Sequence, residues 1–442
     1  MSRIRSILAA AILPLACATA GEPARTAQGD ADLMARARAI HDRVITMDTH
    51  VDISPDNFRP GVQNYVTGVA TQVDLPKMES GGLDAVWFSI YQGQRDDFTA
   101  AGYAAAHETA MSKIEAIRRL TSELAPGRIG LALTAADVRR IAGDGRKVAL
   151  MGMENGYAVG EDIGNIARFA ELGVRYLSLA HNGHSQLSDS NTGERDGYRW
   201  NGLSPLGRQV VAEANRRGIV LDISHPSKAA NLETMRLSLA PVMASHSAVR
   251  GLADHSRNLD DEQLAALKDN GGVVQIVAFA SYLKIAPPDP ARMQALGALR
   301  EEFGIPDGGG AARAAVAALS ADRRAQYEQR MRAIDERHPE PPRANVSDLV
   351  DHIDYAVDLI GIDHVGISSD FDGGGGIDGW NDATETINVT LELVRRGYTE
   401  EQIGKLWSGN LLRVMERAER IARELQAQSG ARPSDTRFAS RR

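Results

Sequence analysis

The sequence predicts an α/β fold, a (β/α)8 TIM-like barrel with a helical insertion after the seventh strand. From residue 44 onward, eight short apolar, β-branched runs alternate with longer amphipathic stretches. Such alternation is typical of a parallel sheet whose strands are joined by helices. Each run is hydrophobic almost throughout, which indicates a sheet covered on both faces. Eight units fit a closed barrel better than an open sheet, and the first strand–helix turn lacks the GxGxxG pattern of dinucleotide-binding folds.

The predicted elements follow one another in a regular order. The strands are Val44–Asp52, Leu83–Tyr91, Val148–Glu154, Val174–His181, Ile219–His225, Pro241–His246, Gly272–Ala280 and His364–Asp370. The helices include Tyr103–Leu124, Pro205–Arg217, Lys228–Leu237, Asp261–Lys268, Thr384–Arg396 and Glu400–Leu425. A chain of 442 residues suits one barrel with insertions, although length alone would also allow two ordinary domains.

One predicted connection is much longer than the others. Residues 283–345 contain several prolines, the run Gly308-Gly309-Gly310 and helical pieces rich in Ala, Arg and Glu. We interpret this segment as a helical insertion and a candidate lid over the barrel mouth, with a disordered linker as the alternative. We expect a single barrel domain over residues 21–428 and an unstructured tail over residues 429–442.

The first twenty residues have the layout of a secretory signal peptide. Arg3 and Arg5 precede the apolar run Ile7–Cys17, and Ala18-Thr19-Ala20 offers a cleavage site. The run is too short to span a bilayer, and nothing downstream reads as a transmembrane helix. We therefore expect an exported protein, periplasmic or secreted. Cys17, the only cysteine of the chain, leaves a lipid-anchored N-terminus as an alternative.

The charge of the chain argues against two classes of partner. The sequence has 50 basic and 58 acidic residues, a net charge of −8, and no basic tract stands out. Neither nucleic acid nor an anionic membrane surface is therefore expected to bind this protein.

Six of the eight predicted strands end in His, Asp or Glu. The residues are His50, Asp52, Glu154, His181, His225, His246 and Asp370. In a barrel the carboxyl ends of all strands meet on one face, which is where active sites are built. Ionisable groups that converge there would repel or desolvate one another unless they share a cation or proton chemistry.

A site for two metal ions would account for five of these groups. His50 and Asp52, two apart on a strand, point to the same face, and His225 and His246 add two ring nitrogens. Glu154 could bridge two ions with its two oxygens. Imidazole and carboxylate ligands favour zinc, with manganese or cobalt as alternatives, and two ions that share a hydroxide make a strong nucleophile. Taken singly, each residue also has an ordinary explanation, such as a hydrogen-bonded pair or a cap.

Beyond these single residues, whole motifs of the sequence resemble the membrane (renal) dipeptidases, zinc-dependent barrel hydrolases related to the amidohydrolases. The resemblance runs from about residue 40 to about residue 420. It rests on the blocks Asp48-Thr49-His50-Val51-Asp52, Gly152-Met153-Glu154-Asn155-Gly156, Arg175-Tyr176-Leu177-Ser178-Leu179-Ala180-His181-Asn182, Asp222-Ile223-Ser224-His225, Ser245-His246-Ser247, Arg257-Asn258 and Ser369-Asp370-Phe371-Asp372-Gly373.

The resemblance implies two zinc ions per subunit and a ligand for each matching position. His50 and Asp52 match the ligands of one ion, and His225 and His246 match those of the other. Glu154 matches the carboxylate that bridges the two ions.

The resemblance also implies roles toward the substrate. His181 matches the histidine that polarises the scissile carbonyl, and Asp370 the carboxylate that carries a proton from the bridging water to the leaving amine. Arg257 matches the arginine that holds the C-terminal carboxylate of the substrate, and Tyr282 is a candidate for a neighbouring contact. As alternatives, Arg257 could pair with a nearby surface carboxylate and Tyr282 could serve packing alone.

The expected function is the hydrolysis of dipeptides by a metal-bridging hydroxide, including, by analogy with the family, dipeptides with a C-terminal D-residue. One alternative is another barrel metallohydrolase that acts on cyclic amides or lactones or by deamination, although many such enzymes carry HxH where this chain has Asp52. A non-catalytic exported binding protein is a second alternative, against which the intact ligand set argues. Unlike the mammalian members, the chain has no pair of cysteines for a disulfide, since Cys17 is its only one, and no apolar C-terminal tail. Its oligomeric state is open, with a homodimer as one option.

Overall fold

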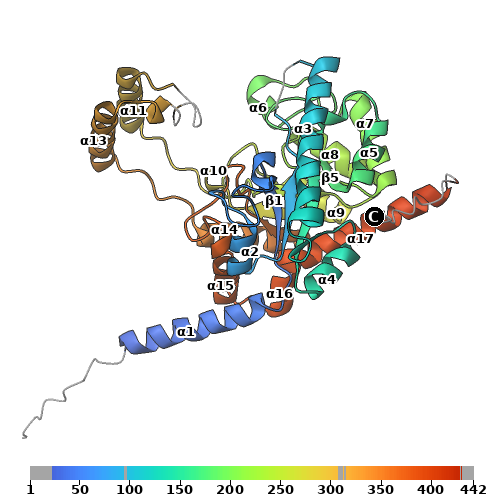
Figure 1. The fold of residues 1–442 in the computed structure, drawn as a ribbon, viewed down its shortest axis with the longest axis horizontal. Helices are drawn as coiled ribbons and strands as arrows, with labels where there is room; N and C mark the ends of the chain where they lie inside the picture. Colours follow the sequence, from blue (N-terminus) through green and yellow to red (C-terminus); the bar gives the residue numbers. More distant parts are fainter. Residues whose placement is uncertain (1–21, 94–96, 307–311, 313–314, 429, 431–442) are drawn as a thin grey trace, which may run out of the picture.

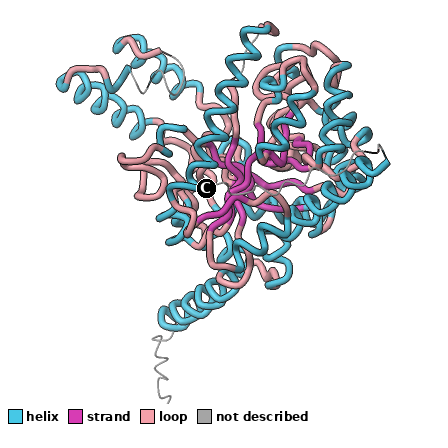
Figure 2. Tube along the Cα trace, turned by 45° about the vertical axis from the view of Figure 1, so that its right-hand side comes forward, coloured by secondary structure: helices cyan, strands magenta, loops and turns pink. Residues whose placement is uncertain are grey.

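Eight parallel strands form the barrel of the computed structural model, which describes residues 22–93, 97–306, 312, 315–428 and 430. The strands gather at the centre of the molecule with helices around them (Figure 2). They follow the order β1 (Met47–Asp52), β2 (Ala85–Ser89), β4 (Lys147–Met153), β5 (Val174–Ser178), β6 (Val220–Asp222), β7 (Met243–Ser247), β8 (Val273–Val277) and β9 (Val365–Ser368). Each predicted strand overlaps one of them, so the predicted barrel is confirmed.

A ninth strand, β3 (Ile129–Leu131), was not predicted from the sequence. It pairs in parallel with β4 from outside the barrel path. Three residues are too few to establish the alternation or the apolar run by which a strand is recognised.

The barrel closes between its last and first strands. The backbone N–H of Asp52 donates to the carbonyl oxygen of Phe371, just past β9, at 2.9 Å. In the same seam, the Asp48 carboxylate accepts from the backbone N–H of Ser369 at 2.9 Å and from the Ser369 hydroxyl. These bonds lie within two residues of His50 or Asp370, so the seam is also part of the site described below.

Helices surround the strands and complete the alternation (Figure 1). The α-helices are α1 (Glu22–His41), α2 (Leu75–Gly81), α3 (Ala100–Arg119), α4 (Ala135–Gly143), α5 (Gly164–Leu172), α6 (Gly193–Asp196), α7 (Pro205–Arg217), α8 (Lys228–Leu237), α9 (Asp261–Asn270), α10 (Ala280–Leu283), α11 (Pro290–Phe303), α13 (Ala321–Arg337), α14 (Val346–Ile360), α15 (Ile387–Arg395), α16 (Glu400–Gly404) and α17 (Asn410–Gln428). The shorter helical turns are η1 (Pro55–Phe58), η2 (Leu120–Leu124), η3 (Gly156–Val159), η4 (Ile362–His364), η5 (Ala383–Glu385) and η6 (Lys405–Gly409).

Local signals explain why several helices begin and end where the sequence predicts. The Ser204 hydroxyl caps α7 by accepting from a backbone N–H, and Gly218, at φ 69°, ends the helix in the left-handed conformation. Asp260 and Gln263 form a capping box at the start of α9. One predicted helix, 400–425, is interrupted by the π-helical turn η6, which separates α16 from α17.

The insertion after the seventh barrel strand is helical, as predicted. Helices α11 and α13 pack against each other around a small core that includes Leu299, Phe303 and Ile305, separate from the barrel core. In both views this pair of helices stands clear of the barrel (Figures 1 and 2). None of its described residues lines the main cavity of the barrel, so the structure gives the lid interpretation no support. α14 then returns to the barrel wall, where Leu349 and Ile353 are fully buried.

Three predictions for the chain ends lie outside the described residues. These are the signal peptide over residues 1–20, the alternative lipid anchor at Cys17, and, except for residue 430, the unstructured tail over residues 429–442. Within the described part of the chain, no helix combines the length and the apolar character that crossing a bilayer requires. Export therefore stays a prediction from the sequence.

The separate core of the α11–α13 pair predicts that these helices can be removed without unfolding the barrel. The chain enters and leaves the pair at neighbouring points, because His338 Nδ1 lies 3.4 Å from Asp289 Oδ2. Replacement of residues 290–337 by a short Gly-Ser linker should leave the main thermal unfolding transition within about 4 °C of the parent. Loss of cooperative unfolding, measured by circular dichroism, would show that the barrel depends on the pair.

Candidate metal centre

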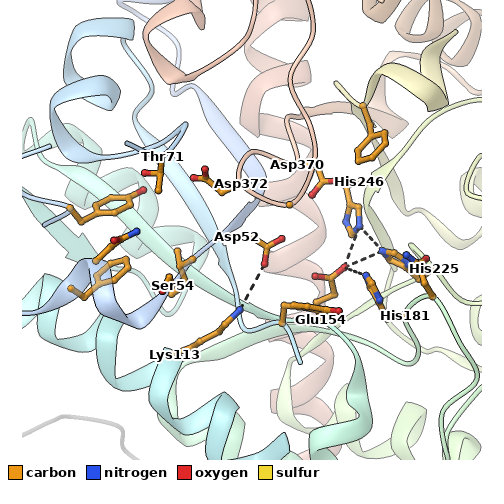
Figure 3. A pocket seen from close by; sticks show the side chains of 18 of the residues that line it. Asp52, Ser54, Thr71, Lys113, Glu154, His181, His225, His246, Asp370 and Asp372 are labelled. Atoms are coloured by element: carbon orange, nitrogen blue, oxygen red, sulfur yellow. Dashed lines mark hydrogen bonds and ion pairs between the residues drawn. The ribbon is translucent and has the colours of Figure 1, made fainter. Parts of the chain in front are cut away.

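The predicted site residues meet at the carboxyl ends of the barrel strands. His50 and Asp52 belong to β1 and His246 to β7, while Glu154, His181, His225 and Asp370 follow β4, β5, β6 and β9. Figure 3 shows Glu154 between Asp52 on one side and the imidazoles of His181, His225 and His246 on the other. The residues scattered through the chain thus form a single cluster.

Glu154 stands at the centre of this cluster. One carboxylate oxygen, Oε2, lies 3.2 Å from His50 Nε2. The other, Oε1, lies 3.0 Å from His225 Nε2 and 3.5 Å from His246 Nε2. Asp52 Oδ2 is 3.9 Å from His50 Nε2. The two oxygens of one carboxylate therefore face two different groups of donors, which is the arrangement expected of a bridging ligand.

Hydrogen bonds to Nδ1 of His225 and His246, on the side of each ring away from Glu154, show which ring nitrogen carries the hydrogen. His225 Nδ1 is 3.0 Å from Asn182 Oδ1, an oxygen that can only accept, so Nδ1 carries the hydrogen. His246 Nδ1 is 2.7 Å from Ser245 Oγ, whose own hydrogen is donated to Asp222 Oδ2 at 2.6 Å. In both rings Nε2 is left with a lone pair that points into the site.

These lone pairs conflict with one another unless a cation lies between them. His225 Nε2 and His246 Nε2 are only 2.9 Å apart, and Glu154 Oε1 faces both. Burial and the positive charge of Arg257 hold the pKa of His225 well below its ordinary value, so the ring does not resolve the conflict by gaining a proton at neutral pH. Unprotonated imidazole and carboxylate form the donor set that zinc prefers, and the residues therefore fit a metal ion.

His50 lies on the other side of Glu154 and differs from these two rings in its protonation. Its Nδ1 lies 2.8 Å from the Tyr176 hydroxyl, while its Nε2 is buried without a hydrogen-bond partner among the described residues. Burial opposes a charged ring, but the carboxylates of Glu154, Asp370 and Asp52 outweigh it and raise the pKa of His50 to about 10. A proton occupies this ring near neutral pH when no metal is bound.

Side chains outside the predicted set hold the candidate ligands in place. Ser89 Oγ donates to Glu154 Oε2 at 3.1 Å, and the Asp48 carboxylate accepts from the backbone N–H of His50 at 3.3 Å. The Tyr176 ring reaches His50 across Gly152, where an added Cβ would lie 2.0 Å from ring atoms. Tyr176, Asp48, Asp222 and Ser245 stand within the motif blocks of the sequence, but their supporting role depends on strand register.

Two residues of the cluster have strained backbones. His225 has φ 82° and Asp370 has φ 59°, both in the left-handed region that non-glycine residues seldom occupy. Such strain is held where the surrounding structure fixes a functional side chain. Burial and the charges of Asp52 and Glu154 also raise the pKa of Asp370 well above its ordinary value, although His50 and Arg257 act in the opposite direction.

The cluster opens into a cavity of about 520 Å³, a size that suits a small ligand. Its lining includes Asp52, Glu154, His181, His225, His246, Phe279, Tyr282, Asp370 and Asp372. His181 Nε2 lies 3.5 Å from Glu154 Oε1, and burial lowers the pKa of this histidine, so its ring is neutral at pH 7.

Arg257 is a buried cation beside the cluster, with 3% of its surface exposed. Its Nη2 donates to the His246 carbonyl oxygen at 3.0 Å, its guanidinium lies 5.4 Å from the centre of the Tyr282 ring, and its Nε has no partner among the described residues. The alternative surface pairs are not formed, because Asp254 pairs with Arg250 and Asp260 with Lys228. Arg257 therefore has no carboxylate partner in the described part of the chain.

Lys113 of α3 lies in the cavity wall and was missed by the sequence analysis. Its ammonium is 3.9 Å from Asp52 Oδ1 and 5.3 Å from the centre of the Tyr91 ring. A signal existed in the sequence, because Lys113 shares the buried face of α3 with Ala106, Ala110 and Ile117. A lysine on such a face is unusual and indicates an internal partner.

Comparison with known proteins identifies relatives over most of the chain. Residues 34–429 match the family described as membrane dipeptidase, Peptidase family M19. The chain is 30% identical over 372 residues to the dipeptidase tcpJ of Claviceps purpurea, which covers 83% of this chain and 73% of that protein. It is 30% identical over 359 residues to the dipeptidase aclJ of Aspergillus oryzae, which covers 80% and 72%.

A solved structure supports the same relationship. The crystal structure of the probable dipeptidase PvdM from Pseudomonas aeruginosa is 33% identical in sequence, with a TM-score of 0.74 over 89% of this chain and 100% of that chain.

The raised pKa of His50 predicts that metal uptake releases a proton. A metal ligand must be a neutral imidazole, whereas this ring is protonated below its pKa of about 10 in the metal-free protein. Zinc binding at pH 7.5 should therefore release at least about one proton per site, and affinity should fall as the pH is lowered. Calorimetric titration of the metal-free protein in buffers of different ionisation enthalpy measures this release. A binding enthalpy independent of the buffer would contradict the assignment.

Proposed function

This chain belongs to the membrane dipeptidase family, Peptidase family M19, and is a dipeptidase; on this premise we propose that it is a binuclear zinc enzyme that attacks the peptide bond with a metal-bridging hydroxide. The observation that carries the proposal is the pair of unprotonated Nε2 atoms, 2.9 Å apart, that face the same oxygen of Glu154. A cation between these atoms would relieve the repulsion of their lone pairs.

The ligands divide into two groups. His50 and Asp52 would hold one ion, His225 and His246 the other, and Glu154 would contact both. When bound, two such ions supply a hydroxide nucleophile at neutral pH and polarise the scissile carbonyl.

Asp370 is suited to carry the proton that peptide hydrolysis must move. Its carboxylate lies 4.0 Å from His50 Nε2 and lines the cavity, and burial raises its pKa. A carboxyl group with a raised pKa can take a proton from the attacking water and give it to the departing amine nitrogen. Its left-handed backbone holds the side chain toward the cluster.

His181 and Arg257 would orient the substrate. The neutral His181 ring can donate an N–H to the carbonyl oxygen as negative charge develops there. Arg257 offers a buried guanidinium without a carboxylate partner among the described residues, which suits the free C-terminal carboxylate of a dipeptide. A clamp at a fixed distance from the metal ligands explains a preference for short substrates, and Tyr282 would form the wall beside it.

The central test is hydrolysis together with metal content. The zinc-loaded protein should release free amino acids from dipeptides such as Ala-Ala, and elemental analysis should find two zinc ions per chain. D370N should keep the metal content near that of the parent while turnover falls by about 10²-fold or more, because the proton carrier is lost. Unchanged turnover in D370N would remove Asp370 from the mechanism. A protein that binds zinc but cleaves no dipeptide would favour the alternative of another barrel metallohydrolase.

The proposed clamp gives a separate prediction. R257A should lower kcat/KM for Ala-Ala by about 10- to 100-fold, mainly through KM, because a charge-assisted contact to the C-terminal carboxylate is lost. The same variant should treat Ala-Ala and its C-terminal amide alike, whereas the parent should prefer the free acid. R236A is the control, since the Arg236 side chain is 70% exposed and faces Glu233 on α8, whereas Arg257 is buried beside the cluster. Equal kinetics of R257A and the parent would refute the clamp.

A further inference from the structure

Lys113 is a buried ammonium that the proposed hydrolysis does not use. Only 8% of the residue is exposed, and it lines the main cavity. It forms no hydrogen bond to any described residue, and its one ion pair, with Asp52 Oδ1, is 3.9 Å long. A buried cation without a close partner is costly, so its retention in the wall of a binding cavity points to a ligand.

The inference rests on the proposed function. If that function holds, Asp52, the ion-pair partner of Lys113, also binds a metal ion. Asp52 is then a zinc ligand, and the negative charge that faces Lys113 is shared with a metal ion. The nearest ring, Tyr91, offers its face at 5.3 Å and no full charge. The ammonium is therefore left to pair with an anion that enters the cavity.

The position of Lys113 tells which part of a dipeptide it would meet. Arg257 contacts the carbonyl of His246 and lines a neighbouring cavity that shares Asn182, Phe279 and Tyr282 with the main one, so it lies beyond the histidine end of the main cavity. In Figure 3, Lys113 lies toward the opposite end, with Ser54 and Thr71, and the metal ligands stand between. A substrate whose C-terminal carboxylate lies at Arg257 and whose peptide bond lies at Glu154 points its N-terminal residue toward Lys113.

The same end of the cavity also holds a carboxylate for the α-ammonium group. Asp372 lines the cavity, and Figure 3 draws it above Asp52, with Lys113 below. Asp372 Oδ1 accepts from the backbone N–H of Gln72 at 2.8 Å, which fixes the carboxylate in this wall. An N-terminal residue would thus meet one anion and one cation on different walls.

We propose that Lys113 binds the side-chain carboxylate of the N-terminal residue of the substrate, so that the enzyme prefers dipeptides that begin with Glu or Asp. The α-ammonium group of the same residue is directed toward Asp372. Lys113 is a specificity-determining residue in this arrangement, and it contributes nothing to the hydrolysis of neutral dipeptides.

The experiment compares Glu-Ala with Gln-Ala, two substrates of nearly equal size that differ in one charge. In the zinc-loaded parent, kcat/KM for Glu-Ala should exceed that for Gln-Ala by about tenfold or more. In K113M the ratio should fall to about 1, with kcat/KM for Gln-Ala within about twofold of the parent and zinc content unchanged. K113R should restore most of the preference, because it restores the charge.

A matched control removes a lysine outside the cavity. K405M changes a residue of η6 that pairs with Asp363 at 3.0 Å and does not line the cavity, and it should leave the ratio as in the parent. If the parent cleaves both substrates at equal rates, the Lys113 inference is wrong while the proposed function stands. If K113M loses zinc and loses activity on both substrates equally, Lys113 only orients Asp52 and the inference is again wrong. If the zinc-loaded parent cleaves neither substrate nor Ala-Ala, the proposed function itself fails.

Discussion

The constraint on which the site depends is the mutual repulsion of donor atoms around Glu154. Two imidazole nitrogens with lone pairs inward, 2.9 Å apart, share one carboxylate oxygen, and a third imidazole faces the other oxygen. A protein interior tolerates such crowding of electron pairs only where a positive charge balances it. The hydrogen bonds to Asn182 and Ser245 assign the hydrogens of two rings to their outer nitrogens, which leaves the inner nitrogens available. Asn182 and Ser245, which lie behind the two imidazoles, therefore determine the protonation of the cluster as much as the inward-facing residues do.

The barrel supplies the geometry that makes this crowding possible. Parallel strands bring their carboxyl ends to one face, and the site draws one or two side chains from each of several strands. Neighbouring strands also hold the segments that carry the candidate site residues, because Asp222 on β6 fixes Ser245 on β7, and Asp48 on β1 binds Ser369 after β9. Gly152 leaves the space through which Tyr176 reaches His50. Local strain at His225 and Asp370 is sustained by this surrounding framework.

Much of the fold and of the cluster could be predicted because both follow from simple periodicities. Apolar runs that end in His, Asp or Glu located the strands and, through the common face of a barrel, the groups that meet there. β3 is too short to show a period, and the π-helical turn η6 interrupts a helix whose apolar pattern continues through it. The roles of Tyr176 and Asp222 depend on which residues of two strands lie side by side, and this register is invisible in a single strand. Lys113 could have been noticed as a charge on an apolar helix face. Its ion-pair partner, Asp52, could not have been identified from the sequence, because it lies sixty-one positions earlier in the chain.

The seam between β1 and β9 has a consequence for the order in which this molecule is assembled. Hydrogen bonds that join the two strands flank His50, Asp52 and Asp370, which come from opposite ends of the barrel sequence. A chain still lacking its last strand has the imidazoles and Glu154 but neither Asp370 nor the backbone that anchors the first strand. The cluster is therefore complete only when the first and last strands are joined.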